Sequence, residues 1–220
     1  MYPQTTSVPK PLIDVCGRPV VQHVMATYAD HGFTDFLLAG GYKHELLTEF
    51  VATIDAPWNV EVIDTGLETN TGGRVRALAD LVADRFFVTY ADGLSNLDIT
   101  ATLAFHEAHG RVATMTTVPL RSQYGVVEFG DDGQVTDFVE RPVLTDRHIN
   151  AGFFVFERRC FDLWPDPGDD LEREVLPAFG EKGELFAYRH DGYWRSLDTY
   201  KDVVQVNAEC DSADLPWPRR

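Results

Sequence analysis

Short apolar runs that alternate with segments of helical periodicity constrain the fold of this chain more than any other feature. Residues 36–39 and 85–90 are largely apolar, which is typical of strands buried on both faces of a sheet. Residues 19–30 instead place apolar side chains such as Val20 and Val24 on one stripe at helical spacing. Strands that alternate with helices predict parallel βαβ units. We therefore expect an α/β fold with a Rossmann-like sheet.

The same patterns locate the remaining elements. Helices are expected over residues 19–30, 43–52, 73–83, 98–109, 170–179 and 199–210, and strands over 36–39, 59–64, 85–90, 111–118, 125–129, 135–139, 152–157 and 184–189. After residue 124, Gly- and Asp-rich turns separate the short runs, which indicates hairpins added to a mixed sheet. The chain has no repeat and no low-complexity linker, so we expect one domain over residues 1–220.

Composition limits the classes of partner. The 220 residues suffice for a full core, and 35 acidic against 19 basic side chains give a net charge of −16. Such a surface repels nucleic acid and anionic membranes, so neither is expected as a partner. Most of the carboxylates need no role beyond solubility. A phosphorylated substrate would need local basic residues and a divalent cation.

The cysteines and the hydropathy pattern bear on the compartment. Cys16, Cys160 and Cys210 lie far apart and form no C-x-x-C pair, which favours reduced thiols over a disulfide framework or a zinc site. No apolar run is long enough to span a bilayer, and no secretory signal segment is evident. These features predict a soluble, cytoplasmic protein.

Three charged residues lie at positions where they could bind phosphate groups or a metal ion. Lys10 lies between Pro9 and Pro11, whose restricted φ angles would direct a cation toward phosphate groups. Asp92 follows a buried strand, where a carboxylate can hold Mg²⁺. Asp198 is its candidate partner. A surface lysine, a turn aspartate and a helix N-cap at Asp198 are the corresponding structural alternatives.

Residues 62–74 pass from a strand through a loop into a helix. The N–H groups at the start of that helix could meet a phosphate or the edge of a base. Thr71 and Arg74 offer a hydroxyl and a guanidinium group to the carbonyl of a pyrimidine, with Gly72 between them. The alternative is a glycine-containing loop with a solvated arginine.

Several residues at predicted hairpin edges could bind a sugar phosphate. Glycine permits close approach of a sugar ring, carboxylate and amide groups can bond its hydroxyls, and an arginine can hold a phosphate through two parallel hydrogen bonds. The candidates are Gly125, Glu140, Arg141, Asn150 and Gly152. Each is a weak signal on its own.

Taken together, these segments resemble the sugar-1-phosphate nucleotidyltransferases. The resemblance begins with Y-P-Q-T-T-S-V-P-K-P-L from Tyr2 and extends to about residue 210. Its cytidylyltransferase members, which act on glucose 1-phosphate, are the most similar, through P-W-N-V from Pro57, D-T-G-L-E-T-N-T-G-G-R from Asp64 and F-H-E-A-H-G from Phe105.

The resemblance implies that an oxygen of the sugar 1-phosphate attacks the α-phosphorus of CTP and expels pyrophosphate, without a protein nucleophile. It implies the following roles: catalysis for Lys10 and Arg141, Mg²⁺ binding for Asp92 and Asp198, nucleotide binding for Thr71, Gly72 and Arg74, and sugar-phosphate binding for Gly125, Glu140, Asn150 and Gly152. Residues 1–123 would form the nucleotide-binding half of the domain and residues 124–220 the sugar-phosphate half.

The chain departs from the family pattern in four places. The strand and the G-G-x-G-T-R-L loop that precede the Tyr2 motif are absent, and Met1 aligns with the final Leu of that loop. Arg141 replaces the usual lysine of E-K-P, and Ala151 replaces a glycine. The segment before Pro57 is also short, so the family's oligomeric state is not carried over and a homo-oligomer is left open.

The missing first strand has a physical consequence. In a doubly wound sheet this strand is usually central, so its loss would leave two strands with unpaired edges and a void beneath the helices. A misplaced start of the deduced protein, a genuine loss and a truncated chain all explain the pattern.

Two other functions compete with the cytidylyltransferase. A non-catalytic nucleotide-sugar-binding or regulatory protein could have lost the phosphate loop, although the retention of Lys10, Asp92 and Asp198 argues against this. A related transferase could use another nucleotide or sugar.

Overall fold

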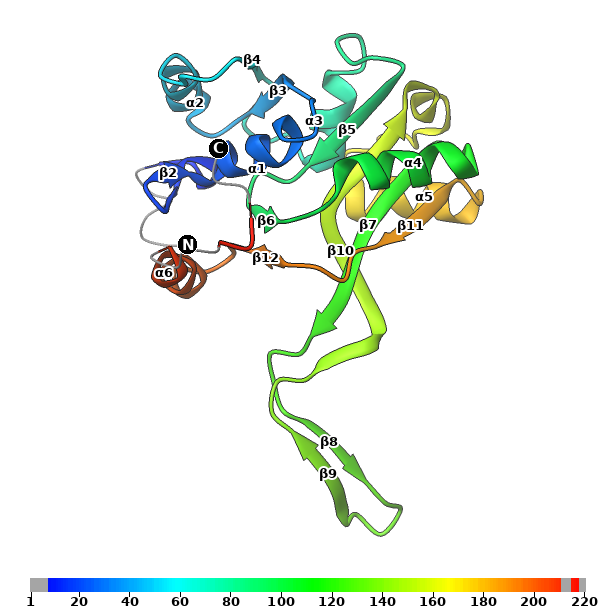
Figure 1. Cartoon of the computed structure of the whole chain (residues 1–220). Helices are drawn as coiled ribbons and strands as arrows, with labels where there is room; N and C mark the ends of the chain where they lie inside the picture. The colour runs from blue at the N-terminus through cyan, green and yellow to red at the C-terminus, as the bar shows by residue number, and fades with distance from the viewer. Residues whose placement is uncertain (1–7, 211–214, 218–220) are drawn as a thin grey trace.

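The computed structural model describes residues 8–210 and 215–217 and shows a mixed α/β body (Figure 1). Its strands are β1 (Asp14–Val15), β2 (Arg18–Pro19), β3 (Asp35–Gly40), β4 (Asn59–Asp64), β5 (Arg85–Thr89), β6 (Gly93–Ser95), β7 (Ala113–Arg121), β8 (Val126–Phe129), β9 (Val135–Val139), β10 (Val143–Glu157), β11 (Leu185–Arg189) and β12 (Trp194–Ser196). Its helices are α1 (Val20–Ala29), α2 (His44–Val51), α3 (Thr71–Ala77), α4 (Ile99–His109), α5 (Leu176–Glu181) and α6 (Tyr200–Glu209). Short helical turns are η2 (Lys10–Leu12), η3 (Arg158–Leu163) and η4 (Leu171–Val175).

The predicted α/β class is confirmed, and every expected helix and strand is present in some form. Helix α3 ends at Ala77, and the following residues continue in turns with i to i−3 bonds such as that from Leu81 N–H to the Leu78 carbonyl. The expected helix at 170–179 opens with the π-helical turn η4 before α5 begins. The Asp170 carboxylate caps η4 by accepting from the N–H groups of Glu172 and Arg173.

The strands form separate sheets in which β5 and β3 are edge strands. The largest sheet has the order β11-β7-β10-β5, with β10 antiparallel to both neighbours and β11 parallel to β7. Strands β3 and β4 form a parallel pair in register from Asp35 opposite Asn59 to Gly40 opposite Asp64. Among the described residues, β3 pairs only with β4 and β5 only with β10.

Two apolar clusters cover the opposite faces of the larger sheet. Phe154, Phe156 and Phe179 belong to the cluster formed with η4 and α5. Phe153 belongs to the cluster formed with α1. Because successive side chains of a strand point to opposite faces, the sequence Phe153-Phe154 within β10 places these clusters on either side of the sheet. This accounts for the buried run at residues 151–156 of that strand. Sequence analysis located β10 only in part, at 152–157.

The hairpin of β8 and β9 projects away from the body (Figure 1). Val127, Phe129, Phe138 and Val139 are exposed along it. Elsewhere in the chain, no helix among the described residues has both the length and the apolar character needed to cross a membrane.

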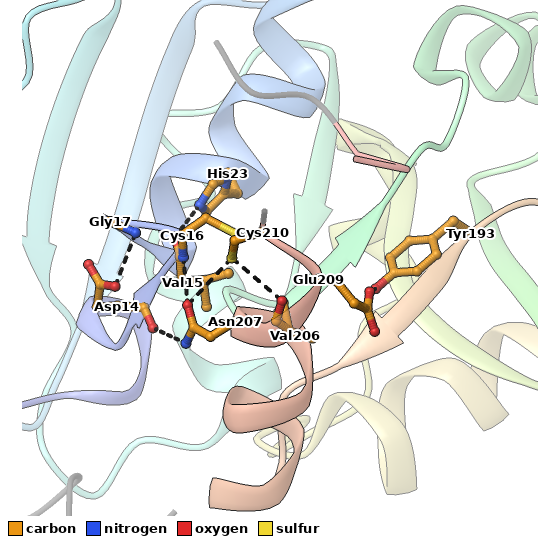
Figure 2. The surroundings of a disulfide bond; sticks show 10 residues. All are labelled: Asp14, Val15, Cys16, Gly17, His23, Tyr193, Val206, Asn207, Glu209 and Cys210. Carbon is orange, nitrogen blue, oxygen red and sulfur yellow. Dashed lines mark hydrogen bonds between the residues drawn. A yellow bond between two sulfur atoms is a disulfide. The ribbon is translucent and has the colours of Figure 1, made fainter. Parts of the chain in front are cut away.

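The prediction of reduced thiols at Cys16 and Cys210 is wrong, because the two residues form a disulfide bond (Figure 2). Their Cα atoms lie 5.4 Å apart although 194 positions separate them in the sequence. Cys16 lies in the turn between β1 and β2, and Cys210 follows α6. Asn207 holds the two segments together by accepting from the Cys16 N–H at 2.8 Å and donating to the Asp14 carbonyl at 3.3 Å. The cysteines therefore no longer support a reducing compartment.

Cys160 is a free thiol, as expected. It lies in the cluster with Phe156 and Phe179, and burial raises its pKa to about 12. A thiol with so high a pKa is protonated at neutral pH and is not a nucleophile.

Candidate active site

Lys10, Asp92 and Asp198 meet beyond the carboxyl end of β5. Lys10 begins the turn η2, which follows Pro9 and is closed by a bond from the Leu12 N–H to the Pro9 carbonyl. Asp92 lies between β5 and β6. Strand β12 pairs with β6, and the Leu197 N–H bonds the Asp92 carbonyl at 3.0 Å, which delivers Asp198 to the same place. The structure therefore brings these three residues together, while their roles remain predictions.

The Lys10 ammonium group is held between the two carboxylates. It donates to Asp198 Oδ1 at 2.9 Å and forms an ion pair with Asp92 Oδ2. Burial lowers the pKa of Lys10, but its hydrogen bonds to Asp92 and Asp198 and their charges outweigh burial and raise the pKa overall. Burial likewise raises the pKa of Asp198, but the hydrogen bonds from Lys10 and Ser196 and the Lys10 charge lower it overall.

The structural alternative for Asp198, a helix N-cap, is overturned. Thr199 is the N-cap of α6, and its side chain accepts from the Asp202 N–H while the Asp202 carboxylate accepts from the Thr199 N–H. These reciprocal hydrogen bonds cap the N-terminus of α6 without the Asp198 side chain. The Asp198 carboxylate is thereby left to bind Lys10.

Asp92 and Asp198 also fit a divalent cation by the chemistry of their donors. Hard cations such as Mg²⁺ take carboxylate oxygens and commonly complete their shell with water and substrate phosphates. In the part of the chain that the structure describes, no three His, Cys, Asp or Glu residues gather into a metal-binding group. The donor set of this pair matches a cation that is shared with a phosphorylated substrate.

The three predicted nucleotide residues occupy the first turn of α3. Thr71 Oγ1 accepts from the Leu171 N–H at 3.0 Å and donates to Glu172 Oε2 at 2.7 Å, so it joins α3 to η4. Arg74 Nη1 donates to the Gly40 carbonyl at 2.8 Å and also to the Thr65 hydroxyl. In this structure Arg74 thus ties α3 to the carboxyl ends of β3 and β4.

Gly72 owes its identity to packing. A Cβ atom at this position would lie 2.5 Å from the Gly168 carbonyl oxygen, closer than real Cβ contacts allow. The neighbouring Gly73 N–H bonds the Asp169 carbonyl at 3.0 Å. The loop before η4 therefore lies directly on the start of α3, and this contact supports the position of Thr71.

Sequence analysis assigned no role to Tyr90 or Glu172, yet they connect the two predicted halves. The Tyr90 hydroxyl donates to Glu172 Oε1 and accepts from Asn150 Nδ2 at 3.2 Å. Glu172 also accepts from Thr71, so a nucleotide candidate and a sugar candidate share one network. The position of Tyr90, two residues before Asp92, was a usable signal. Glu172 gave none, because it lies in a segment read only as an amphipathic helix.

The predicted sugar-phosphate residues fall into two groups. Asn150 and Gly152 lie beside Tyr90, with Asn150 Oδ1 accepting from the Gly152 N–H at 2.8 Å. Gly152 has φ of +77°, and a Cβ there would lie 2.5 Å from the Tyr90 ring. Gly125, Glu140 and Arg141 instead flank the hairpin of β8 and β9, which projects from the body (Figure 1).

In this second group, Glu140 and Arg141 pair with each other. Arg141 Nε lies 3.4 Å from Glu140 Oε1, and both side chains are about 60 % exposed. The structure therefore brings Asn150 and Gly152 to the site while Gly125, Glu140 and Arg141 stand apart from it.

The amino-acid sequence matches the nucleotidyl transferase family over residues 1–212. It is 34 % identical to the glucose-1-phosphate cytidylyltransferase of Salmonella typhi over 97 % of this chain and 92 % of that protein. It is 33 % identical to the probable glucose-1-phosphate cytidylyltransferase of Bacillus subtilis with the same coverage.

Among solved structures, HddC from Yersinia pseudotuberculosis in complex with GMP-PN superposes with a TM-score of 0.72 at 21 % identity, over 92 % of this chain and 90 % of that chain. A putative glucose-1-phosphate thymidylyltransferase from Bacillus anthracis gives 0.72 at 18 % identity, over 98 % and 92 %. These structures confirm the fold of the nucleotide-diphospho-sugar transferases. The sequence matches show that the chain belongs to the nucleotidyl transferase family and is an enzyme of nucleotide-sugar synthesis.

Proposed function

We propose that this nucleotidyltransferase joins CTP and glucose 1-phosphate to give CDP-glucose and pyrophosphate, with Mg²⁺ as its cation. The proposal is supported by the identity to cytidylyltransferases over nearly the whole chain. The observation that carries the chemistry is the Lys10 ammonium held between Asp92 and Asp198 at the carboxyl edge of the sheet. An oxygen of the sugar 1-phosphate attacks the α-phosphorus of CTP, and the bond to the bridging oxygen of pyrophosphate breaks.

The protein's part in this reaction is positioning and charge neutralisation. Lys10 faces the phosphates and offsets the negative charge that grows on the leaving pyrophosphate. When bound by Asp92 and Asp198, a divalent cation supplies further positive charge at the phosphates. Asn150 and Gly152 bind the sugar. The hydrogen bonds of Tyr90 and Glu172 fix their position relative to the nucleotide residues at the start of α3.

The remaining assignments follow the family resemblance. Thr71, Gly72 and Arg74 bind the cytosine nucleotide. Gly125, Glu140 and Arg141 contact the sugar phosphate once the hairpin that they flank, or a neighbouring copy of it, comes within reach of the site.

The test is release of pyrophosphate from glucose 1-phosphate and each of the four ribonucleoside triphosphates, with and without Mg²⁺. We expect turnover with CTP and Mg²⁺, and a loss of about 10²-fold or more in Lys10→Met. Lys201→Met is the matched control, because Lys201 is exposed on α6. Preference for another nucleotide would overturn CTP as the substrate. No turnover with any nucleotide, from protein that circular dichroism shows to be folded, would overturn catalysis by this chain alone.

A further inference from the structure

Trp194 connects the strand that leads to Asp198 with the segment that carries two of the sugar candidates. It lies in β12, which pairs with β6, four positions before Asp198. Its indole Nε1–H donates to the Ala151 carbonyl at 2.8 Å. Ala151 stands between Asn150 and Gly152 in the sequence, so one side chain of β12 bonds the backbone at the sugar side of the site.

The regular pairing of β10 with β7 is interrupted at Ala151 and Gly152. Asn150 is the last residue paired before the interruption and Phe154 is the first after it, yet their partners on β7 are only two positions apart. The extra residues make β10 bulge out of the ladder here. The Ala151 carbonyl and the Gly152 N–H, which are the two ends of one peptide group, therefore need partners outside the regular ladder.

This peptide group is held at both ends by side chains. Trp194 binds its carbonyl oxygen, and Asn150 Oδ1 accepts from its N–H at 2.8 Å. An N–H can bond only to the oxygen of the Asn150 amide, so the Nδ2 group points the other way and donates to the Tyr90 hydroxyl at 3.2 Å. The orientation of the Asn150 amide therefore depends on the orientation of the peptide group.

The backbone alone does not fix this orientation. Gly152 has φ of +77°, and glycine adopts negative φ angles about as readily. Rotation of the peptide group would turn its carbonyl toward Asn150, which would then have to present its Nδ2 group there instead of to Tyr90. The bond from Trp194 opposes that rotation, because the carbonyl of the buried Ala151 would lose the indole N–H.

The indole ring is itself held in place by packing. It packs against the buried cluster that includes Leu97 and Phe153. A Cβ atom at Gly93 would lie 3.7 Å from the indole Nε1, so the ring lies next to the residue that follows Asp92. A rigid aromatic donor on β12 thus sets the backbone of β10, and residues on both sides of this contact belong to the site.

We propose that Trp194 is a positioning residue for the sugar phosphate, whose indole N–H holds the Ala151–Gly152 peptide in the orientation that directs the Asn150 amide toward the sugar. This role rests on the proposed function, in which Asn150 and Gly152 bind the sugar. Loss of the indole N–H should weaken binding of glucose 1-phosphate more than it slows the chemical step, because Lys10 and Asp92 keep their pairing.

The first measurement is hydrogen exchange at the Gly152 amide, followed by NMR in the full chain without ligand. Trp194→Phe removes the indole N–H, and exchange at Gly152 is expected to become at least about tenfold faster. Trp164→Phe is the matched control, because it removes the same kind of bond, from Trp164 Nε1 to the Gly168 carbonyl at 2.9 Å. Exchange at Gly152 should not change in this control. Equal exchange in Trp194→Phe and the unaltered protein would overturn the proposal.

The second measurement is the KM for glucose 1-phosphate with the nucleotide that supports turnover. We expect a rise of about 3- to 10-fold in Trp194→Phe, as for the loss of one hydrogen bond, with a smaller change in kcat. Trp164→Phe should change this KM by less than about twofold. In the Asn150→Ala background, Trp194→Phe should also add less than about twofold, since Trp194 acts through Asn150. A full rise in that background, or an equal rise in Trp164→Phe, would overturn the positioning role.

Failure of this role and failure of the proposed function give different results. If the unaltered protein turns over no nucleotide, the proposed function fails, and exchange at Gly152 alone decides whether Trp194 holds the peptide. If turnover is present and Gly152 exchanges faster in Trp194→Phe while the KM is unchanged, the positioning role is wrong and the function stands. Where Trp194→Phe does not fold, 3-benzothienylalanine at this position keeps the two-ring shape and replaces the N–H by sulfur, and the same two measurements decide.

Discussion

Loss of the disulfide between Cys16 and Cys210 should cost this protein a large part of its stability. The bond closes a loop of 194 positions, which restricts nearly the whole unfolded chain. In the chain-entropy treatment, a loop of this length contributes about 5 kcal/mol at 25 °C. Since the stability of a domain is only about 5–15 kcal/mol, reduction should bring the protein close to unfolding.

The contacts that remain after reduction should preserve the native structure around the two cysteines. Asn207 still bonds Cys16 N–H and the Asp14 carbonyl, and Val206 remains buried against Val15. These contacts keep α6 against the first hairpin in the native state, so the effect falls mainly on the unfolded chain. We expect the free energy of unfolding to fall by about 2–5 kcal/mol.

The assay is urea unfolding, monitored by tryptophan fluorescence, of the protein with and without dithiothreitol. Cys16→Ser, Cys210→Ser and the double variant should each match the reduced protein, and the double variant should not respond to dithiothreitol. Thiol titration of the denatured, non-reduced protein should find one free thiol, that of Cys160. A count of three thiols, or equal midpoints with and without reductant, would refute the reasoning.

Three further predictions concern the site and its supports. First, the pKa of Asp198 is lowered in the folded state, so the stability that Asp198 contributes is present above the ordinary aspartate pKa and is lost as the pH falls through the folded pKa. Acid unfolding of Asp198→Asn should therefore depend less steeply on pH than that of the unaltered protein. An unchanged profile would contradict the pairing of Asp198 with Lys10. Second, Gly72→Ala should destabilise by about 1–3 kcal/mol in thermal unfolding, since its Cβ would meet the Gly168 carbonyl. Gly180→Ala, whose Cβ meets nothing within 4 Å in α5, should be neutral or stabilising by up to about 1 kcal/mol, and equal losses in both variants would remove the packing argument. Third, Tyr90→Phe should raise the KM for the sugar phosphate more than it lowers kcat, because it releases Asn150 and Glu172 without removing Lys10; an unchanged KM would separate Tyr90 from the sugar side of the site.

Local pattern was sufficient for the fold because the strands carry strong signals. The run at 59–64 coincides with β4, and the run at 85–90 differs from β5 by one residue. The rule that ligand-binding residues follow the carboxyl ends of strands singled out Asp92, and the structure brings Lys10 to the same place. Burial of a strand depends on a few neighbouring residues, and the direction of parallel strands depends on whole elements. Both can therefore be predicted from the local sequence pattern.

The failures share a different cause. The Cys16–Cys210 bond and the contact between Tyr90 and Glu172 each join residues that are far apart in the sequence. The sequence around either partner gives no indication of the contact, which is seen only in the folded chain. The N-cap of α6 was left open for a local reason, because Asp198 and Thr199 are adjacent and both residue types cap helices. Asp202 decides in favour of Thr199, since only that pairing completes the reciprocal capping bonds.

The position of Asp198 depends on different contacts from those that fix the end of α6. The pairing of β12 with β6 and the bond from the Leu197 N–H to the Asp92 carbonyl hold Asp198 from its N-terminal side. The Thr199 capping box then starts α6 at the next residue, and the disulfide acts only beyond the last turn of that helix. Loss of the disulfide should therefore lower the free energy of unfolding while the folded fraction keeps its pairing of Lys10 with Asp198. If activity per folded molecule fell in proportion to stability in Cys210→Ser, the site and the end of α6 would have to be coupled, and this separation of roles would be wrong.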